Sequence, residues 1–242
     1  MNIINIEHIS KLFGDKLIFD DASFGLQEGD KVGIVGINGT GKSTLLRQLK
    51  TALAPHGLRE GEITFCGTPL SRIPSRRQAA EIGFVQQNPD NQIVTDFVWH
   101  ELAFGLENMA LSVPVIRRRV AEMAAFFGME TWFRSKTTEL SGGQKQLMNL
   151  ASALAMGPKL LILDEPFVGL DPKASHTLKG MMRELCDAGA AIFFSTHVLE
   201  VAEKLCNKIA IIKNGRLVAA GETGTVKGDH SLEDVFMELI DA

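Results

Sequence analysis

Eight residues in the first quarter of the chain have the types and spacing to hold a phosphate group. They run from Gly36 to Ser43, read GINGTGKS, and match the pattern G-x-x-x-x-G-K-[ST] between an apolar strand and a predicted helix. Glycines such as Gly39 and Gly41 let backbone N–H groups turn towards a phosphate, which the start of the following helix also favours. Lys42 supplies a positive charge for the β- and γ-phosphates, and the Ser43 hydroxyl is placed to bind Mg²⁺. The pattern predicts a nucleotide site, with an ordinary glycine turn as the alternative.

Two adjacent acids follow an apolar strand in the second half of the chain. The strand, Leu160 to Leu163, has the composition of a strand inside a sheet, and its carboxyl end would project Asp164 into the crevice that holds the phosphate loop. Asp164 would then hold Mg²⁺ through its water shell, and Glu165 would orient or deprotonate the attacking water. The alternative is that the two acids cap the next helix.

A second anion-binding element is predicted where Leu140 to Gln144, read LSGGQ, opens a helix with Ser141 at its N-cap. A glycine pair at a helix start is by itself an ordinary loop. However, one ATP molecule cannot easily contact two helix starts of the same lobe. Either the chain binds two ligands or the second element serves another copy.

Composition limits the class of protein in which these residues act. The chain has 242 residues, 45% of them apolar, which is enough for a substantial core, and a net charge of -4 gives no case for a nucleic-acid partner. Cys66, Cys186 and Cys206 lack paired spacing and predict free thiols in a reducing cytosol. The first ten residues lack the layout of a secretory signal, and no apolar run approaches the about 18 residues that cross a bilayer.

The elements that position these motifs fall into three parts. The first third and the last third mix strands with helices, which predicts right-handed crossovers in a largely parallel sheet, preceded by an antiparallel hairpin. The middle has helical periodicity only and predicts a helical insert. Expected strands are 3–13, 17–26, 31–35, 63–66, 82–85, 160–163, 190–194 and 208–212; expected helical regions are 42–53, 94–127, 142–156, 173–187, 198–205 and 232–240.

Together, the glycine loop, the Asp-Glu strand end and the LSGGQ pentapeptide resemble the ATP-binding cassette family, and the resemblance spans essentially the whole chain. It implies an α/β fold: a P-loop NTPase core of the RecA-like type with an antiparallel β subdomain and an inserted α-helical subdomain. The whole chain, 1–242, would be one nucleotide-binding domain, with 1–87 and 157–242 forming the core and β subdomain and 88–156 the helical subdomain. The resemblance also implies a head-to-tail dimer in which each ATP lies between one copy's phosphate loop and the other copy's LSGGQ segment.

The resemblance assigns roles to further residues. Gln87 would sense Mg²⁺ and the attacking water, with its neighbour Gln86 the weaker candidate, and His197 would contact the γ-phosphate. Phe13 would stack on adenine, with core packing as the alternative. The implied catalytic residues are Glu165, His197 and Gln87; the implied metal ligands are Ser43, Gln87 and Asp164; the implied ATP contacts are Phe13, Gly36, Asn38, Gly39, Gly41, Lys42, Ser43, Thr44, Ser141, Gly142, Gly143, Gln144 and Asp171.

Likeness to branches of the family is uneven along the chain. Residues 1–50 are similar to translation-factor cassettes, 83–155 to energy-coupling-factor importers, and 164 onwards to exporter cassettes. We therefore hypothesise a mosaic, engineered by joining fragments of related cassettes, with a natural divergent member as the alternative. Leu147 stands where the family often has arginine; this removes a charge without touching a phosphate ligand.

The function implied is hydrolysis of Mg-ATP by a dimer of cassettes that powers transport through a membrane permease. The partners would be ATP, a second copy or a homologous cassette, and a transmembrane permease subunit that docks on the helical insert. The protein would be cytoplasmic and peripheral on the inner face of the cell membrane when bound to the permease. The alternatives are a soluble ATPase of this family outside transport, a kinase-like P-loop enzyme, and a chimeric cassette that folds without a transport role.

Overall fold

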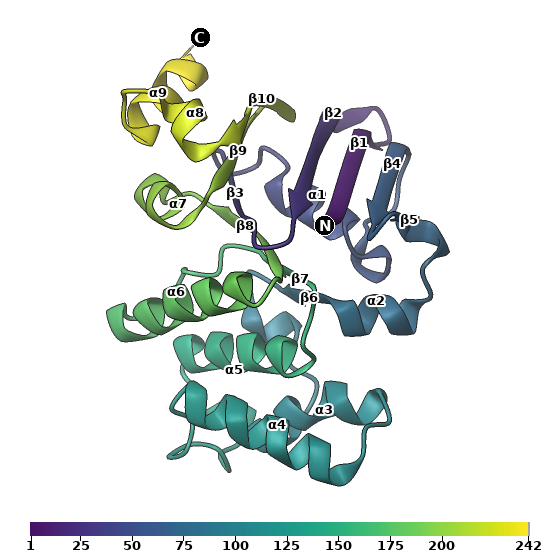
Figure 1. Ribbon diagram of the computed structural model, residues 1–242, viewed down its shortest axis with the longest axis vertical. Helices are drawn as coiled ribbons and strands as arrows, with labels where there is room; N and C mark the ends of the chain where they lie inside the picture. Colours follow the sequence, from purple (N-terminus) through teal and green to yellow (C-terminus); the bar gives the residue numbers. More distant parts are fainter. Residues whose placement is uncertain (242) are drawn as a thin grey trace.

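The computed structural model describes residues 1–241, and in this part of the chain the centre of the fold is a mixed sheet of ten strands (Figure 1). The strands lie side by side in the order β5-β4-β1-β2-β10-β9-β3-β8-β7-β6. In chain order they are β1 (Asn2–Phe13), β2 (Lys16–Gln27), β3 (Lys31–Val35), β4 (Arg59–Phe65), β5 (Thr68–Pro69), β6 (Ile82–Val85), β7 (Leu160–Leu163), β8 (Ala191–Thr196), β9 (Lys208–Lys213) and β10 (Arg216–Glu222).

The helices form separate groups around this sheet. Figure 1 shows α3, α4 and α5 gathered at one end of the molecule and α8 and α9 at the other, beside the carboxyl terminus. The helices of the described residues are α1 (Lys42–Gln48), α2 (Ser75–Glu81), α3 (Val98–Asn108), α4 (Val113–Phe126), α5 (Gly142–Ala155), α6 (Pro172–Asp187), α7 (Leu199–Leu205), α8 (Thr223–Lys227) and α9 (Leu232–Asp241). None of them, within residues 1–241, is long and apolar enough to cross a membrane.

The neighbouring strands β9, β3, β8, β7 and β6 run parallel, which confirms the predicted parallel sheet. Val35 pairs with Thr196, and Leu163 pairs with Phe194, so β3, β7 and β8 end at the same edge of the sheet. Ligands of such sheets bind in the crevice outside the carboxyl ends of the strands. This register therefore brings together three segments that are distant in sequence.

The strands β1, β2 and β4 form an antiparallel sheet beside the parallel one. The hairpin of β1 and β2 has the predicted turn, and β1 also pairs with β4. On the other side of the hairpin, β2 meets β10 at the pair Arg216 and Asp20. Strand β2 also reaches the phosphate loop, because a Cβ added to Gly41 would lie 3.0 Å from the Ile18 carbonyl oxygen.

Apolar residues of the parallel strands alternate between two cores, one on each face of the sheet. In β7, Leu161 and Leu163 belong to the core that includes residues of α5, α6 and α7. Leu160 and Ile162 belong to the other core, which includes residues of α1 and of the antiparallel strands. The period of two that defines a strand thus also decides which face of the sheet each side chain covers.

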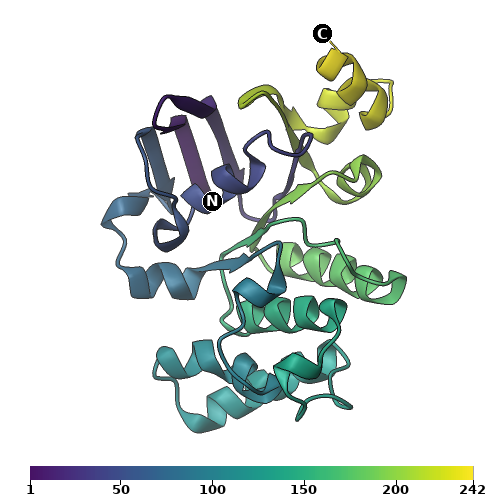
Figure 2. The same cartoon turned by 180° about the vertical axis from the view of Figure 1, so that it is seen from behind.

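Helices α3, α4 and α5 form the helical part predicted in the middle of the chain. Seen from opposite sides, Figures 1 and 2 show α5 between the pair α3 and α4 and the rest of the molecule. The chain leaves α3 through Ala110, whose φ is 56°, and Pro114 lies in the first turn of α4. A left-handed residue and a proline at a helix start explain why the continuous periodicity of 94–127 yields two helices.

The structure differs from the sequence prediction in three places. Helix α1 ends at Gln48, and the chain continues as a short 3₁₀ turn (Thr51–Leu53) that Gln78 holds through its side-chain oxygen. Helix α2 was not predicted because its sequence, SRRQAAE, has no apolar periodicity. Instead, Gln78 of α2 donates to the carbonyls of Leu70 and Ile73. Strand β10 and helix α8 were not predicted either.

Candidate functional site

The phosphate loop runs from the end of β3 to the start of α1. Gly39 and Gly41 have φ of 84° and 97°, in the left-handed region that glycine adopts most readily. Gly36 has no room for a side chain, because a Cβ there would lie 2.6 Å from the Ile212 carbonyl oxygen. The Thr40 hydroxyl donates to the Ile37 carbonyl at 2.9 Å and closes the loop on itself. Glycine at these positions is therefore required by the shape of the loop.

Lys42 is buried and its ammonium group is bound inside the loop. Nζ donates to the carbonyl oxygens of Gly36 and Ile37, the latter at 3.3 Å, and lies 3.6 Å from Oε1 of Glu165. Both members of this ion pair have side chains only 7% exposed. A buried charge is costly without partners, and the loop supplies them to Lys42.

Asp164 follows β7, and one of its carboxylate oxygens accepts hydrogen bonds from two hydroxyl groups. Oδ1 accepts from Ser43 Oγ at 2.9 Å and from Ser195 Oγ at 2.7 Å. Among the described residues its other oxygen, Oδ2, is buried without a hydrogen-bond partner. An unsatisfied carboxylate oxygen beside a serine hydroxyl is the donor set that a hard cation with oxygen ligands takes, so these residues fit Mg²⁺.

Glu165 bridges the lysine and the predicted histidine. Its Oε2 lies 2.8 Å from Nδ1 of His197, while its Oε1 faces Lys42. The side chain of His197 is 53% exposed. The backbone of Glu165 has φ of 50°, an uncommon value for a residue other than glycine, and its N–H donates to Ser195 Oγ at 2.8 Å.

A cavity of about 320 Å³ lies over these groups. Among the predicted residues, the cavity is lined by Asn38, Gly39, Gly41, Lys42, Ser43, Thr44 and Glu165. Gln87 also lines it, from the segment after β6, whereas Gln86 does not. Ile18 of β2 also lines it; an apolar strand residue carries no signal in sequence that would have predicted this. Residues from four separate segments thus meet in one cavity. Its lining is Ile18, Ile37, Asn38, Gly39, Thr40, Gly41, Lys42, Ser43, Thr44, Gln87 and Glu165.

The second predicted element is formed but lies outside this cavity. Ser141 caps α5: its hydroxyl accepts from Gln144 N–H at 3.3 Å, and the Gln144 side chain accepts from Ser141 N–H at 2.9 Å. Ser141 and Gly142 are exposed. Gly143 approaches the loop before α6, because a Cβ there would lie 3.2 Å from the Gly169 carbonyl oxygen.

Two further predicted residues are also outside the cavity. Asp171 is the N-cap of α6, where Oδ1 accepts from Ala174 N–H at 2.7 Å. Phe13, at the end of β1, is 39% exposed, and the Lys11 ammonium lies 5.4 Å from its ring centre. Lys11 is itself held by the carbonyls of Pro55 and Gly57. Burial, and then the charge of Arg59, lower the pKa of Lys11.

Ser195 is a second residue of the site, besides Ile18, that was not predicted. It is fully buried at the end of β8 and contacts both acids. Strand β8 begins with the apolar run AIFF, and Ser195 follows that run directly. The signal in the sequence is this hydroxyl group after four apolar residues. That signal predicts a polar environment at the strand end, but not the partners.

Comparison with protein families places the chain among transport ATPases. A family model described as "ABC transporter" matches residues 19–168. A shorter one, described as "AAA domain, putative AbiEii toxin, Type IV TA system", matches residues 136–203.

Three relatives are 36% to 40% identical to the chain over the aligned residues. A putative ABC transporter ATP-binding protein of Bacillus anthracis is 40% identical over 91% of the chain, which spans only 41% of that relative. The energy-coupling factor transporter ATP-binding protein EcfA2 of Methanospirillum hungatei is 37% identical over 86% of the chain and 52% of the relative. The Nod factor export ATP-binding protein I of Burkholderia orbicola is 36% identical over 90% of the chain and 70% of the relative.

Solved structures share the fold over almost the whole chain. One, described as the ATP binding subunit of an ABC transporter, superimposes with a TM-score of 0.88 and 28% identity, covering 98% of this chain and 99% of that one. Another is cbiO1 of Clostridium perfringens, described as part of the transporter complex cbiONQ. It has a TM-score of 0.81 and 31% identity, and the match covers 94% of this chain and 91% of that one.

Proposed function

The chain belongs to the ABC transporter family of ATP-binding cassettes, which are ATPases, and on this premise we propose that two copies of it bind head to tail and hydrolyse two Mg-ATP to drive transport through a membrane permease. The observation that carries the proposal is the placement of the two anion-binding helix starts. The start of α1 lines the cavity, whereas the start of α5 is exposed outside it. A helix start whose N–H groups face solvent can bind an anion that another molecule holds.

In this proposal the cavity holds the phosphates and supplies the charge that they need. The phosphate loop binds them through N–H groups, and Lys42 moves from its carbonyl partners to the β- and γ-phosphates. Bound Mg²⁺ would neutralise phosphate charge, held by Ser43 and by the unsatisfied oxygen of Asp164. Gln87, which lines the cavity, would complete its surroundings. No group of three or more His, Cys, Asp or Glu side chains within residues 1–241 could hold a metal ion alone, so the remaining ligands would come from ATP and water.

Hydrolysis requires a base and a group that reads the γ-phosphate. Glu165 is the base: its carboxylate lies at the cavity wall and is held by Lys42 and His197 before ATP binds. When Lys42 turns to the phosphates, Glu165 is freed to accept a hydrogen bond from water. His197, which is 53% exposed and contacts Glu165, would contact the γ-phosphate.

The other copy would close the cavity. Ser141, Gly142 and Gly143 would present N–H groups and a hydroxyl to the γ-phosphate, with Gln144 and Asp171 beside them. Phe13, which is 39% exposed and does not line the cavity, would stack on adenine. These roles, and the division of the chain into 1–87 with 157–242 and the insert 88–156, stay predictions.

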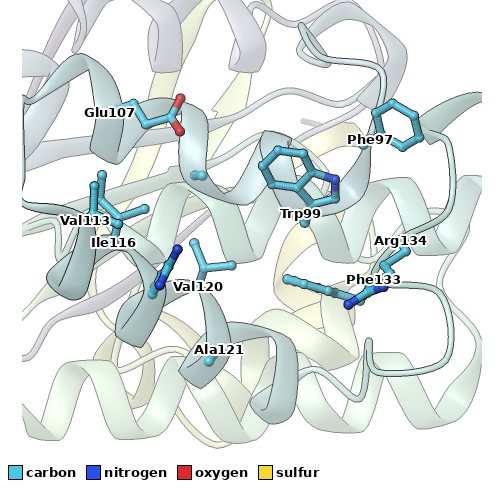
Figure 3. A pocket seen from close by; sticks show the side chains of 11 residues that line it. Phe97, Trp99, Glu107, Val113, Ile116, Val120, Ala121, Phe133 and Arg134 are labelled. Carbon is cyan, nitrogen blue, oxygen red and sulfur yellow. The ribbon is translucent and has the colours of Figure 1, made fainter.

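The helical insert offers a surface for the permease. A groove of about 680 Å³ lies between α3 and α4, and it is lined mostly by apolar side chains (Figure 3). Trp99 is 43% exposed there, and Phe97 and Val113 are exposed at its edges. An exposed aromatic and aliphatic groove is typical of a binding surface. A permease bound here would hold the cassette at the inner face of the membrane. The mosaic origin stays a hypothesis; a single Bacillus relative aligned over 91% of the chain favours natural divergence.

The proposal is tested with a Glu165→Gln variant, which removes the base and keeps the size of the side chain. We expect this variant to bind Mg-ATP without hydrolysing it and to accumulate as a dimer, because ATP held between two copies is not consumed. Light scattering measures its mass with and without Mg-ATP. A variant that remains monomeric at saturating Mg-ATP would contradict the head-to-tail proposal. The matched control, Glu165→Gln with Lys42→Ala, should remain monomeric.

A further inference from the structure

Ser195 is a buried hydroxyl that contacts both acids of the site and that the proposed function leaves without a role. Its Oγ donates to Asp164 Oδ1 at 2.7 Å and accepts from Glu165 N–H at 2.8 Å. It is fully buried, so water does not compete for either bond. One hydroxyl thus connects the side chain of the predicted metal ligand with the backbone of the predicted base.

The sheet register explains this position. Ile162 of β7 and Phe193 of β8 belong to the core on the α1 face of the sheet. Continuing the period of two, Asp164 and Ser195 are the next side chains on that face, just beyond the paired residues Leu163 and Phe194. They therefore meet at the carboxyl edge of the sheet, beneath the start of α1.

For Asp164, the consequence is a fixed carboxylate. Ser195 and Ser43 both donate to Oδ1, from the strand side and the helix side respectively. This leaves Oδ2 as the oxygen without a partner among the described residues. A carboxylate held by hydrogen bonds to one oxygen presents the other in a fixed direction, which is what groups behind a metal ligand do.

For Glu165, the consequence is a fixed backbone. Its φ of 50° lies in the left-handed region, which is unfavourable for a residue with a Cβ. Pro166 follows it, and a residue before proline favours extended conformations. The bond from Glu165 N–H to Ser195, together with the turn bond from Val168 N–H to the Glu165 carbonyl at 3.2 Å, holds this conformation. A relaxed Glu165 would move its carboxylate away from Lys42 and His197.

We propose that Ser195 is a positioning residue that orients Asp164 and Glu165 together, so that metal binding and activation of water are set by one hydroxyl group. This inference rests on the proposed function, because it needs Asp164 and Glu165 to act on Mg-ATP. If Ser195 instead had only a structural role, its hydroxyl would satisfy buried polar groups and nothing more. Its loss would then lower stability without changing hydrolysis by the folded protein.

The test compares Ser195→Ala with a control of the same strand and face, Phe193→Leu, which creates a cavity away from the acids. In Ser195→Ala we expect kcat for ATP to fall by about 10- to 100-fold, with the KM for ATP changed less than about threefold, because the phosphate loop is intact. The Mg²⁺ concentration for half-maximal rate should rise by a similar factor of about 10. Phe193→Leu should lower the melting temperature and leave all three values within about twofold.

A second measurement does not depend on hydrolysis. The melting temperature of the wild-type protein should rise on adding ATP with EDTA and rise further when Mg²⁺ replaces EDTA. Ser195→Ala should keep the first rise and lose most of the second. Ser195→Thr, which retains the hydroxyl, should recover most of kcat and of the Mg²⁺ increment.

The outcomes separate the inference from the function on which it rests. If Ser195→Ala lowers the melting temperature but keeps kcat, the Mg²⁺ midpoint and the Mg²⁺ increment, as Phe193→Leu does, Ser195 is structural and the inference is wrong. If wild-type hydrolysis is absent, or is unaffected by Lys42→Ala, the proposed function itself is wrong.

Discussion

The molecule contains two glycine-rich helix starts that we predict to bind anions, and their surroundings are opposite. At the start of α1, the Lys42 and Ser43 side chains already have partners inside the chain, Gly36, Ile37, Glu165 and Asp164. At the start of α5, Ser141 bonds only with Gln144 and Lys145 of its own first turn among the described residues, and it is exposed. The start of α1 forms one half of a pocket with all of that half's groups in place, whereas the start of α5 lies exposed on the surface.

This difference shows that the same local chemistry can serve two molecules. Both helix starts have free N–H groups and no acidic residue in the first turn, so both favour an anion. At α1, Lys42 and Ser43 contact two carboxylates that follow β7, whereas the cation in the first turn of α5, Lys145, pairs with Asp90. We infer that α1 supplies the charges for hydrolysis and that α5 completes the pocket of another copy. The predictions below test this comparison, from the largest expected effect to the smallest.

The largest effect is expected from Lys42→Ala. The variant loses the cation for the phosphates and the ion pair that Lys42 makes with Glu165, so ATP hydrolysis should fall at least about 100-fold. Phosphate release measures the rate. Lys204→Ala, which removes an exposed lysine paired only with Glu200 on its own helix, is the control and should retain the wild-type rate. Equal rates in the wild type and Lys42→Ala would mean that the start of α1 is not the hydrolytic half.

A mixing experiment tests whether the two starts belong to different copies. Ser141→Arg blocks the start of α5 and leaves the phosphate loop intact, so it and Lys42→Ala should each be inactive alone. In an equal mixture half of the dimers are mixed and each contains one complete pocket, so about a quarter of the wild-type rate should return. A mixture as inactive as its components would contradict a pocket shared between copies.

Asp30 provides a carboxylate with the opposite character at the other edge of the sheet. Unlike Asp164, both of its oxygens have partners: Gln27 N–H at 2.7 Å, Asn207 Nδ2 at 2.9 Å and Lys208 Nζ at 2.7 Å. Burial alone would raise the pKa of Asp30, but the hydrogen bonds and the Lys208 charge outweigh it and lower the pKa below its ordinary value of 3.8. Asp30→Asn should therefore lower the free energy of unfolding by about 2 kcal/mol at neutral pH.

The stabilisation that Asp30 contributes to the folded protein should depend on pH in a defined direction. A carboxyl group whose pKa is lowered by folding stabilises the folded protein at pH values above its ordinary pKa. This stabilisation is lost as the pH falls towards the pKa of the group in the folded protein. The difference between wild type and Asp30→Asn, measured by urea unfolding, should thus be constant near neutrality and shrink below about pH 4. Hydrolysis by the folded variant should equal that of the wild type. A difference that grows on acidification would show that Asp30 is not stabilised by its ionised form.

The smallest effect concerns the cap of α5. Ser141→Ala removes the acceptor for Gln144 N–H and should lower the free energy of unfolding by about 1 kcal/mol. Ser112→Ala is the matched control, because Ser112 occupies the N-cap of α4 without a side-chain capping bond. Urea unfolding of both variants measures the difference. Equal values would mean that the Ser141 hydroxyl does not stabilise α5 in the free protein.

Elements whose stabilisation is local could be predicted from the sequence. The strands 31–35, 82–85 and 160–163 have the predicted bounds because each is a short apolar run between turn residues. Helix α2 could not be predicted, because Gln78 stabilises it through carbonyls of another segment and not through its own periodicity. The same limit applies to Ser195, whose partners depend on strand order.

By itself, the sequence determined the two anion-binding helix starts, the acids at the end of an apolar strand, and the parallel sheet between them, because each depends on residue types within one segment. Only the tertiary structure decided which of these segments meet. The register of β3, β7 and β8 brings Lys42, Asp164, Glu165 and His197 to one edge, while the path of the helical insert leaves Ser141 exposed. Adjacency across a sheet depends on strand order, which no local pattern of residues specifies.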